Sequence, residues 1–379
     1  MKQFQIAFFS SSDFCIPIAQ NIIDNKGKTL LEIYSEQVIK FKTKSEYSVI
    51  FPVLFDIHDI VELDLPVELS LVVTQPDTEN RGKVVSNPVA IWARENGVEL
   101  FNPDSFNKSK GEIENKLDIA ITASFGQIIS ESSLTWPNNG FVNWHPSLLP
   151  LYRGATPMQA AIKNGDKESG LSWINMTKGF DEGDIFAQFK TNIEQDNFGS
   201  MCERLGKLGA RTWAIAIVNK LIKKSLEQDS TKVSFCGKLT KEDRLVNPKG
   251  QTAKEIYDQF RAYSAFPGAA FNDEYFGEEI KIIEASVAIL NLFQDPLVVE
   301  AGISPYEGGG NEVDGGRSIN DTPTEKIQPT RFQNWLVTKI NKQQKVYLSC
   351  KDNTQLEISK IKLANGKQID LSGYQFKTK

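Results

Sequence analysis

The sequence has few of the residues that bind transition metals or form disulfides. Its 379 residues include four cysteines, which lie far apart and form no C-x-x-C pair. This spacing favours free thiols in a reducing compartment. Only two histidines are present, His58 and His145. Because zinc sites are usually built from several histidine and cysteine ligands, we expect a protein without a bound metal.

Long apolar runs are also scarce. The run near the N-terminus extends only from Phe4 to Phe9, which is too short for a signal peptide. Nothing later in the chain reaches the roughly 18 apolar residues of a membrane span. We therefore expect a cytoplasmic monomer that has no membrane partner.

Positive charge is in deficit over the whole chain but not at its end. The chain has 43 lysine and arginine residues against 48 aspartate and glutamate residues, a net charge of −5. That total argues against a protein whose whole surface binds nucleic acid. Residues 331–379, however, contain ten basic and three acidic residues. Such a segment suits a phosphate backbone, and the alternative is an ordinary lysine-rich, solvated surface.

Short apolar runs alternate with helix-like segments over the first 226 residues. Strands are expected at 4–9, 69–74, 117–123, 140–145 and 171–176, and helices at 14–23, 89–96, 155–164 and 197–226. Strands that alternate with helices pair in parallel and are covered on both faces. The sequence therefore predicts the α/β fold class with a Rossmann-like, mostly parallel sheet.

The pattern changes near residue 230. A helix is expected at 252–263 and short strands at 279–284, 335–340, 345–350 and 355–361. Turn residues separate several of these strands, which is typical of a small β-barrel of the OB-like type. We expect one domain over residues 1–228 and a C-terminal barrel-like domain over residues 229–379.

Two stretches do not fit this plan. Residues 28–66 lie where an α/β connection normally needs only a few residues. Residues 295–325 contain seven acidic residues and one arginine, a composition that indicates a flexible acidic loop. We interpret both as insertions, and the sequence leaves their role open.

The densest group of polar residues follows the strand expected at 140–145. Asn143 and His145 are two positions apart at its end, so both side chains leave the same face of the sheet. An amide and an imidazole can donate hydrogen bonds to a developing oxyanion, and an imidazole can also transfer a proton. Asp181 lies in a turn between Gly179 and Gly183 and could orient the ring. The alternative is a hydrogen-bonded strand-end histidine and a turn-forming aspartate.

The residues around this group carry a family resemblance. The segment Asn143-Trp-His-Pro-Ser-Leu-Leu-Pro150 precedes Arg153-Gly154 and the Gly179–Asp184 turn. These motifs, in this order, resemble the signature of formyltransferases that use 10-formyltetrahydrofolate. Among these enzymes the chain is most similar to the branch that acts on methionyl-tRNA. Residues 10–12, three serines, depart from the Gly-Thr-Pro-type turn of the family.

The resemblance implies roles for individual residues. It assigns the catalytic positions to Asn143, His145 and Asp181, with Asn143 and His145 stabilising the tetrahedral oxyanion and Asp181 orienting His145 and assisting proton transfer. It assigns folate binding to two segments, and a purely structural role is equally open for the second of them. The folate-binding residues are Ser147, Leu148, Leu149 and Pro150 in the first segment and Phe125, Gly126, Gln127 and Ile128 in the second.

The resemblance also implies the acceptor. The segment from Gln75 to Lys83 is similar to a loop of the tRNA-specific enzymes, which implies that Arg81 and Lys83 contact tRNA, and Arg153 is assigned to the same surface. The expected reaction is formyl transfer from 10-formyltetrahydrofolate to initiator methionyl-tRNA for translation initiation. Two alternatives stay open: a formyltransferase acting on an amino sugar or another small metabolite, and a non-catalytic binding module of the same fold.

Overall fold

The computed structural model describes residues 2–43, 47–51, 64–80, 82–114, 117–288, 330–340 and 343–377. The chain divides into two compact units, Met1–Leu239 and Thr240–Lys379. This division lies shortly after the boundary expected from the sequence at residues 228 and 229. The predicted acidic loop at 295–325 lies outside the described residues.

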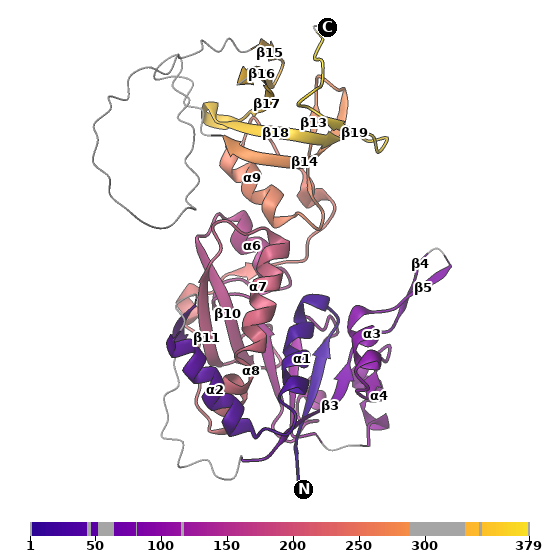
Figure 1. The fold of residues 1–379 in the computed structure, drawn as a ribbon, viewed down its shortest axis with the longest axis vertical. Coiled ribbons are helices and arrows are strands. Elements are labelled where there is room, and N and C mark those ends of the chain that lie inside the picture. Colours follow the sequence, from indigo (N-terminus) through magenta and orange to yellow (C-terminus); the bar gives the residue numbers. More distant parts are fainter. Residues whose placement is uncertain are drawn as a thin grey trace, which may run out of the picture. The chain divides into compact units, whose positions relative to one another are not determined.

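Within the described residues of the first unit, eight strands form one sheet in the order β2-β11-β10-β8-β7-β1-β3-β6. The strands β8, β7, β1, β3 and β6 pair in parallel, and β10, β11 and β2 extend the sheet with antiparallel pairing. The α/β class with a mostly parallel central sheet is thus confirmed (Figure 1). Their bounds are β1 Phe4–Ser10, β2 Ser48–Phe51, β3 Val67–Val73, β6 Leu100–Phe101, β7 Ile119–Ala123, β8 Phe141–His145, β10 Glu168–Asn175 and β11 Ile185–Asn192.

Helices pack on this sheet and on one another. They are α1 (Ile16–Asp24), α2 (Leu30–Thr43), α3 (Pro88–Glu95), α4 (Phe106–Ser109), α5 (Glu131–Leu134), α6 (Pro157–Lys163), α7 (Phe198–Ala210) and α8 (Trp213–Leu221), with short 3-10 turns at Asp13–Cys15, Lys110–Glu112 and Ser230–Lys232. A capping box between Asn197 and Ser200 starts α7, which satisfies amide groups that the first turn leaves free. In α7, Gly206 approaches the chain of Phe14 so closely that an added Cβ would lie 2.0 Å from the Phe14 carbonyl oxygen. This contact brings α7 against the start of α1.

One predicted helix differs from expectation, and the predicted insertion at 28–66, whose role the sequence leaves open, contains a helix. The helix expected at 197–226 is two helices, because the chain breaks at Arg211 and Thr212, where the Thr212 hydroxyl accepts a hydrogen bond from Trp173 Nε1 at 2.8 Å. Within residues 28–66, α2 packs against α8, and its Gln37 accepts a hydrogen bond from the Ala214 amide at 3.2 Å. The described helix of this segment is therefore part of the sheet's cover.

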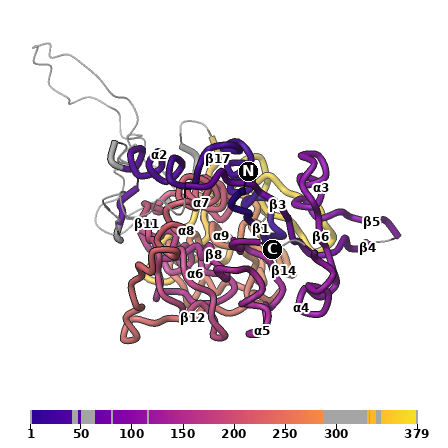
Figure 2. Tube along the Cα trace, turned by 90° about the horizontal axis from the view of Figure 1, so that it is seen from below, coloured from indigo at the N-terminus to yellow at the C-terminus, as the bar shows by residue number. Residues whose placement is uncertain are grey.

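Two small strand pairs complete the first unit. One joins β9 (Arg153–Gly154) to β12 (Phe235–Cys236) in parallel, and the other is the hairpin of β4 (Thr78–Asn80) and β5 (Lys83–Val85). Figures 1 and 2 both show this hairpin extending away from the sheet beside α3. Its Val84 side chain is largely exposed, so the hairpin has no core of its own.

The second unit is an antiparallel sheet with one helix. Among the described residues the strand order is β13-β14-β18-β17-β16-β15, with β19 on β18. A β-rich C-terminal domain is confirmed, and the OB-like form of its barrel stays a prediction. The elements are α9 Ala253–Ala262, β13 Ala269–Asp273, β14 Glu278–Ala288, β15 Thr330–Phe332, β16 Trp335–Ile340, β17 Gln343–Ser349, β18 Gln355–Lys362 and β19 Gln368–Asp370, with 3-10 turns at Glu242–Arg244 and Lys351–Asn353.

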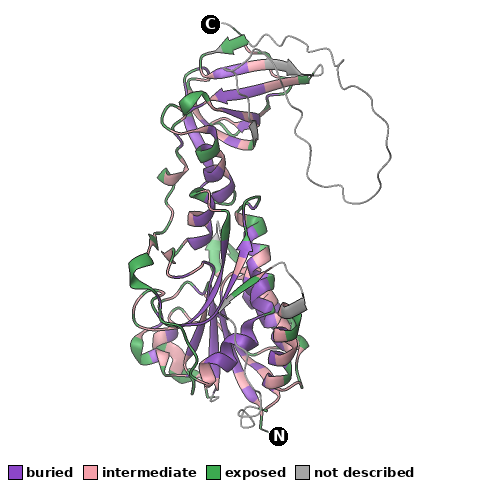
Figure 3. Cartoon of the chain, turned by 90° about the vertical axis from the view of Figure 1, so that its left-hand side faces the viewer, coloured by how far each residue is buried: buried purple, intermediate pink, exposed green. Residues whose placement is uncertain are grey.

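Each unit has its own apolar core. Figure 3 shows the buried residues concentrated along the strands of both sheets and on the inner faces of the helices. In the first unit, Phe9 packs edge-on against Phe106, Phe125 and Phe141, with ring centroids 4.8–5.2 Å apart. Over the described ranges, no helix is long and apolar enough to cross a membrane, and no cluster of three or more potential ligand side chains could hold a metal ion.

Candidate active site

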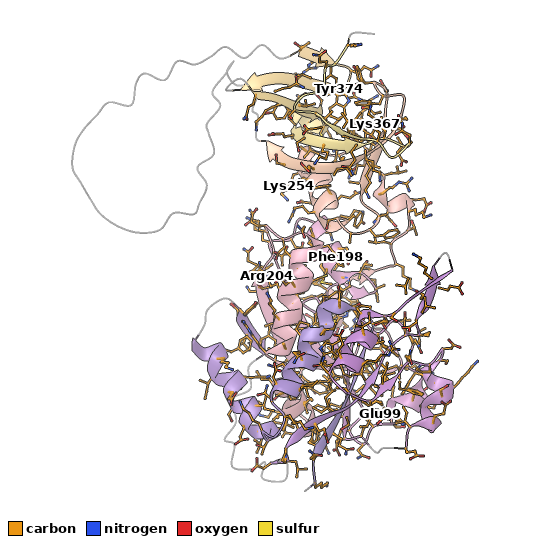
Figure 4. The ribbon with its side chains drawn as sticks, turned by 45° about the vertical axis from the view of Figure 1, so that its right-hand side comes forward. Glu99, Phe198, Arg204, Lys254, Lys367 and Tyr374 are labelled. Carbon is orange, nitrogen blue, oxygen red and sulfur yellow. The ribbon has the colours of Figure 1, made fainter. Side chains whose placement is uncertain are left out.

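A cavity of about 530 Å³ lies beyond the carboxyl ends of β7 and β8. Ligands of open α/β sheets bind at this edge, and the volume is in the range of pockets that hold small molecules. Its lining includes the loop at 124–129 after β7 and the turn at 177–181 after β10. Phe198, at the start of α7 (Figure 4), also lines the cavity.

Three polar side chains meet at one side of this cavity. Asn143 Nδ2 lies 3.4 Å from Asp181 Oδ1, and His145 Nδ1 lies 3.5 Å from the same oxygen. The structure therefore brings together the three residues that the sequence predicts as catalytic, and their roles stay predictions. The Thr122 hydroxyl donates to Asn143 Oδ1 at 2.9 Å, which directs the amide nitrogen of Asn143 towards Asp181. Sequence reasoning missed Thr122, because an isolated strand threonine carries no motif.

The His145 ring is held at both nitrogens. Its Nε2 lies 3.0 Å from the Tyr152 carbonyl oxygen, while its Nδ1 faces Asp181. Both neighbours are acceptors, so both contacts are hydrogen bonds only when both ring nitrogens carry protons. The imidazole side chain is 4% exposed. Tyr152 was not predicted, since it contributes a backbone atom and its side chain gives no signal.

The Asp181 carboxyl group is partly buried, yet its pKa lies below the ordinary value. Burial on its own would raise its pKa, yet the hydrogen bond and charge of His145, the Gly154 amide and the Arg153 charge together lower the pKa. The Gly154 amide donates to Oδ2 at 2.9 Å. Nearby positive charge and hydrogen bonds to the carboxylate both favour its ionised form.

The backbone around Asp181 is unusual. Asp181 itself has a φ of 52°, a left-handed conformation that is uncommon for residues other than glycine. Gly183 packs so closely on β10 that an added Cβ would lie 1.9 Å from the Asn175 carbonyl oxygen. Gly183, two residues after Asp181, is therefore required by this close packing.

The loop after β7 lines the cavity with all four of its predicted folate residues: Phe125, Gly126, Gln127 and Ile128. Gly126 has a φ of +81°, and an added Cβ would lie 2.3 Å from Gln75 Nε2. The Gln127 side chain is used within the protein, accepting from the Phe106 amide at 2.9 Å and donating to the Pro103 carbonyl oxygen at 3.0 Å. Ile128 is 74% exposed, which leaves its apolar surface available to a ligand.

The other segment predicted to bind folate does not line the cavity. It consists of Ser147, Leu148, Leu149 and Pro150, and none of the four is among the lining residues. Two buried polar side chains bind the backbone of this segment. The Ser172 hydroxyl donates to the Ser147 carbonyl oxygen at 2.7 Å, and Gln188 Nε2 donates to the Leu149 carbonyl oxygen at 2.9 Å. Contact between this segment and folate stays a prediction.

The residues predicted to contact tRNA lie on different elements of the chain where the structure describes them. Lys83 is exposed on β5, and Arg81 lies outside the described residues. Arg153 is on β9, where its Nε and Nη2 donate to Gln228 Oε1 at 3.0 and 2.8 Å. Contact between these three residues and tRNA stays a prediction.

The chain is similar in sequence to known formyltransferases. The sequence profile of the formyl transferase family matches residues 57–217. The methionyl-tRNA formyltransferase of Thermotoga neapolitana is 37% identical over 225 residues, which are 56% of this chain and 70% of that protein. The methionyl-tRNA formyltransferase of Mycoplasmopsis pulmonis is 32% identical over 243 residues, 62% of this chain and 83% of that protein.

A solved structure shares the fold. The N-formyltransferase from Helicobacter canadensis, crystallised with folinic acid and dTDP-3-aminofucose, superposes with a TM-score of 0.52. The match covers 94% of this chain and 99% of that chain, at 15% sequence identity. At this identity the likeness concerns the fold alone.

Proposed function

The chain belongs to the methionyl-tRNA formyltransferase family, and we propose that it transfers the formyl group of 10-formyltetrahydrofolate to the α-amine of initiator methionyl-tRNA. The observation that carries this proposal is the meeting of Asn143, His145 and Asp181 at one side of the cavity. An amide donor, an imidazole and an ionised carboxylate are the groups that acyl transfer to an amine needs.

The residues of the cavity fit a folate. The loop at 125–128 lines the cavity and offers apolar surface from Ile128, while Gly126 leaves room for the side chain of Gln75. Pockets of this kind combine apolar walls with a few well-placed polar groups. When bound, 10-formyltetrahydrofolate supplies the formyl carbon as an electrophile for the amine.

The polar side chains then act on the formyl oxygen. An amide NH2 has two hydrogens, so Asn143 can donate one to Asp181 and the other to the oxygen on which negative charge develops. His145 donates to the same oxygen by exchanging its bond to the Tyr152 carbonyl oxygen, which lies 3.0 Å from Nε2. As the new bond from the amine to the formyl carbon forms and the bond from that carbon to N10 breaks, a His145 ring protonated at both nitrogens can deliver a proton to N10. The ring can then take up the proton that the attacking amine loses.

Asp181 has the supporting role in this scheme. Its pKa is lowered by the neighbouring His145, the Gly154 amide and the Arg153 charge despite burial, so it stays ionised and is a weak base. We assign it to orienting His145 and stabilising the charged ring, and only to assisting removal of the amine proton. This division follows the general rule that an effective base has a pKa near the working pH.

The acceptor is proposed from the identity of the relatives and from charge. Relatives that match at 32–37% identity carry the methionyl-tRNA formyltransferase name. The basic residues at 331–379 and the exposed Lys83 on the β4–β5 hairpin suit a phosphate backbone.

The test is a transfer assay with the full chain, labelled 10-formyltetrahydrofolate and charged initiator methionyl-tRNA, with formylmethionine as the measured product. We expect transfer to tRNA, and we expect His145→Ala to lower turnover by about 10²–10⁴-fold with little change in thermal unfolding. The other histidine provides the matched control, and His58→Ala should keep parental turnover. Formylation of an amino sugar nucleotide in place of tRNA, or near-parental turnover of His145→Ala, would contradict the proposal.

A further inference from the structure

The side-chain amide of Gln228 uses both its donor nitrogen and its acceptor oxygen in hydrogen bonds to the Asp181 turn and to Arg153. Its Nε2 donates to the backbone carbonyl oxygens of Asp181 at 2.8 Å and Gly183 at 2.7 Å. Its Oε1 accepts from Arg153 Nε at 3.0 Å and from Nη2 at 2.8 Å. The residue is 8% exposed. A reversed amide would set oxygen against two carbonyl oxygens and NH2 against a guanidinium, so only one orientation satisfies every group.

The short strand β9 holds the same turn from a second side. Gly154, the residue after Arg153, donates its amide to Asp181 Oδ2 at 2.9 Å. Its own position is fixed by pairing with β12, where an added Cβ would lie 2.1 Å from the Cys236 carbonyl oxygen. The dipeptide Arg153-Gly154 therefore contacts the turn twice, through a backbone amide to the carboxylate and through Gln228 to the turn's backbone.

The turn needs such support. Asp181 adopts a φ of 52°, a conformation disfavoured for a residue with a Cβ and one that persists when the surroundings enforce it. Its contacts to His145 Nδ1 and Asn143 Nδ2, at 3.5 and 3.4 Å, are long. A small relaxation of the turn would move Oδ1 out of reach of both groups.

We propose that Gln228 and Arg153 form a clamp that positions Asp181 against His145, so that both are positioning residues for the reaction. The inference rests on the proposed function, because it gives Asp181 its importance. It also gives Arg153 a different task from the tRNA contact that its sequence context suggests, since two nitrogens of its guanidinium are already bound to Gln228.

The first test separates turnover from substrate binding. In Gln228→Leu and in Arg153→Met, kcat at saturating tRNA should fall by up to about 100-fold, as expected when a catalytic group is misplaced by about an ångström. The KM values for tRNA and for the formyl donor should change less than about threefold. The double variant should lose little more than either single variant, because both substitutions break one clamp.

Two further variants refine this test. Gln228→Glu keeps the length of the side chain and its contact with Arg153 but replaces the donors that face the Asp181 and Gly183 carbonyl oxygens. It should therefore also lower kcat, and it can be used in place of Gln228→Leu if that variant fails to fold. Arg204→Met is the matched control, since Arg204 lies on α7 (Figure 4), outside the residues that line the cavity, and pairs with Asp196 through Nε at 3.1 Å. It should keep parental kcat.

The second test does not depend on activity. The chain has two histidines, so the ring signals of His145 can be assigned by NMR after His58→Gln. Those signals should move in Gln228→Leu and in Arg153→Met, because Asp181 no longer holds its place beside the ring, and they should not move in Arg204→Met. This measurement tests whether Gln228 and Arg153 position Asp181 even if the parent chain transfers no formyl group to tRNA and the proposed function fails.

The proposal is overturned by parental His145 signals and parental kcat in the Gln228 variants. It is overturned equally if Arg153→Met raises the KM for tRNA and weakens its salt dependence while kcat and the His145 signals stay parental. That second result would place Arg153 on the tRNA surface.

Discussion

Each unit of the protein contains an aspartate whose carboxylate is bound by neighbouring N–H groups and whose pKa burial tends to raise, yet the pKa values of the two shift in opposite directions. Asp181 in the first unit faces the cavity, and its pKa is lowered. Asp273 in the second unit accepts from the amides of Tyr275 and Phe276 at 3.0 Å and from Trp335 Nε1 at 2.9 Å. Its pKa is raised, because burial outweighs these three hydrogen bonds.

The difference lies in charge. Asp181 has His145 and Arg153 as cationic or potentially cationic neighbours, whereas the neighbouring charge that acts on Asp273 is Glu274, which raises the pKa further. Hydrogen bonds from neutral groups hold both carboxyl groups in place, but only around Asp181 do neighbouring positive charges add to them and lower the pKa. The two aspartates therefore differ in the charge of their neighbours, which is positive around Asp181 and negative beside Asp273.

The largest expected difference between Asp181 and Asp273 is in turnover when each is replaced by asparagine. Asp181→Asn removes the negative charge beside His145, so under the proposed function turnover should fall by about 10²–10⁴-fold while the chain stays folded. Asp273→Asn should leave kcat at saturating tRNA near the parental value, because its neighbours are Trp335 and backbone amides of the second unit. Transfer kinetics and thermal unfolding of both variants measure the contrast. A comparable loss of kcat in Asp273→Asn would break it.

Much of the frame around Asp181 could be predicted from the sequence. The apolar strands of the sheet are visible as short runs, and the spacing of Asn143 and His145 puts both on one face. The strand β11 (Ile185–Asn192) was missed because it carries the polar residues Gln188 and Thr191, which are nevertheless buried. Gln188 is satisfied by the Leu149 carbonyl oxygen and the Ser172 hydroxyl, partners that no local pattern reveals.

The surroundings of the site were less predictable for a related reason. Gln228 lies far along the chain from Asp181 and has no motif around it. Tyr152 acts through its carbonyl oxygen, and every residue has one. Local patterns predict which side chains share a face, whereas the contacts that fix charge and orientation depend on long-range packing.

Two glycines offer a second comparison of the turns. Gly183 follows Asp181, and its added Cβ would lie 1.9 Å from the Asn175 carbonyl oxygen, whereas no described atom lies within 4 Å of a Cβ added to Gly277 in the Asp273 turn. Gly183→Ala should therefore lower the unfolding free energy by about 1–3 kcal/mol through overpacking and should also lower kcat.

Gly277→Ala should cost about 1–2 kcal/mol, because Gly277 has a φ of +72° and a left-handed conformation disfavours a side chain. Its kcat should stay parental. Urea unfolding and transfer assays of the two variants measure both effects. The distinction between an enclosed active-site turn and an open structural turn fails if Gly277→Ala lowers kcat as much as Gly183→Ala.

The smallest expected effects concern the pH dependence of the unfolding free energy, to which Asp181 and Asp273 should contribute with opposite signs. Both carboxyl groups have an ordinary pKa of 3.8. Since the pKa of Asp181 is lowered in the folded chain, the unfolded chain binds more protons near pH 4. The stabilising contribution of the Asp181 charge is therefore present above 3.8 and lost as the pH falls through the folded pKa. Since Asp273 has a raised pKa, the folded chain binds more protons, and stability falls as the pH rises from 3.8 through the folded pKa.

Urea unfolding of the parent, Asp181→Asn and Asp273→Asn over about pH 3 to 7 tests these signs. The stability difference between parent and Asp181→Asn should grow in favour of the parent as the pH rises through the lowered pKa of Asp181. The difference between parent and Asp273→Asn should shift against the parent as the pH rises above 3.8. The same sign in both pairs would mean that neighbouring charge does not distinguish the two aspartates, because burial alone would then set the ionisation of each.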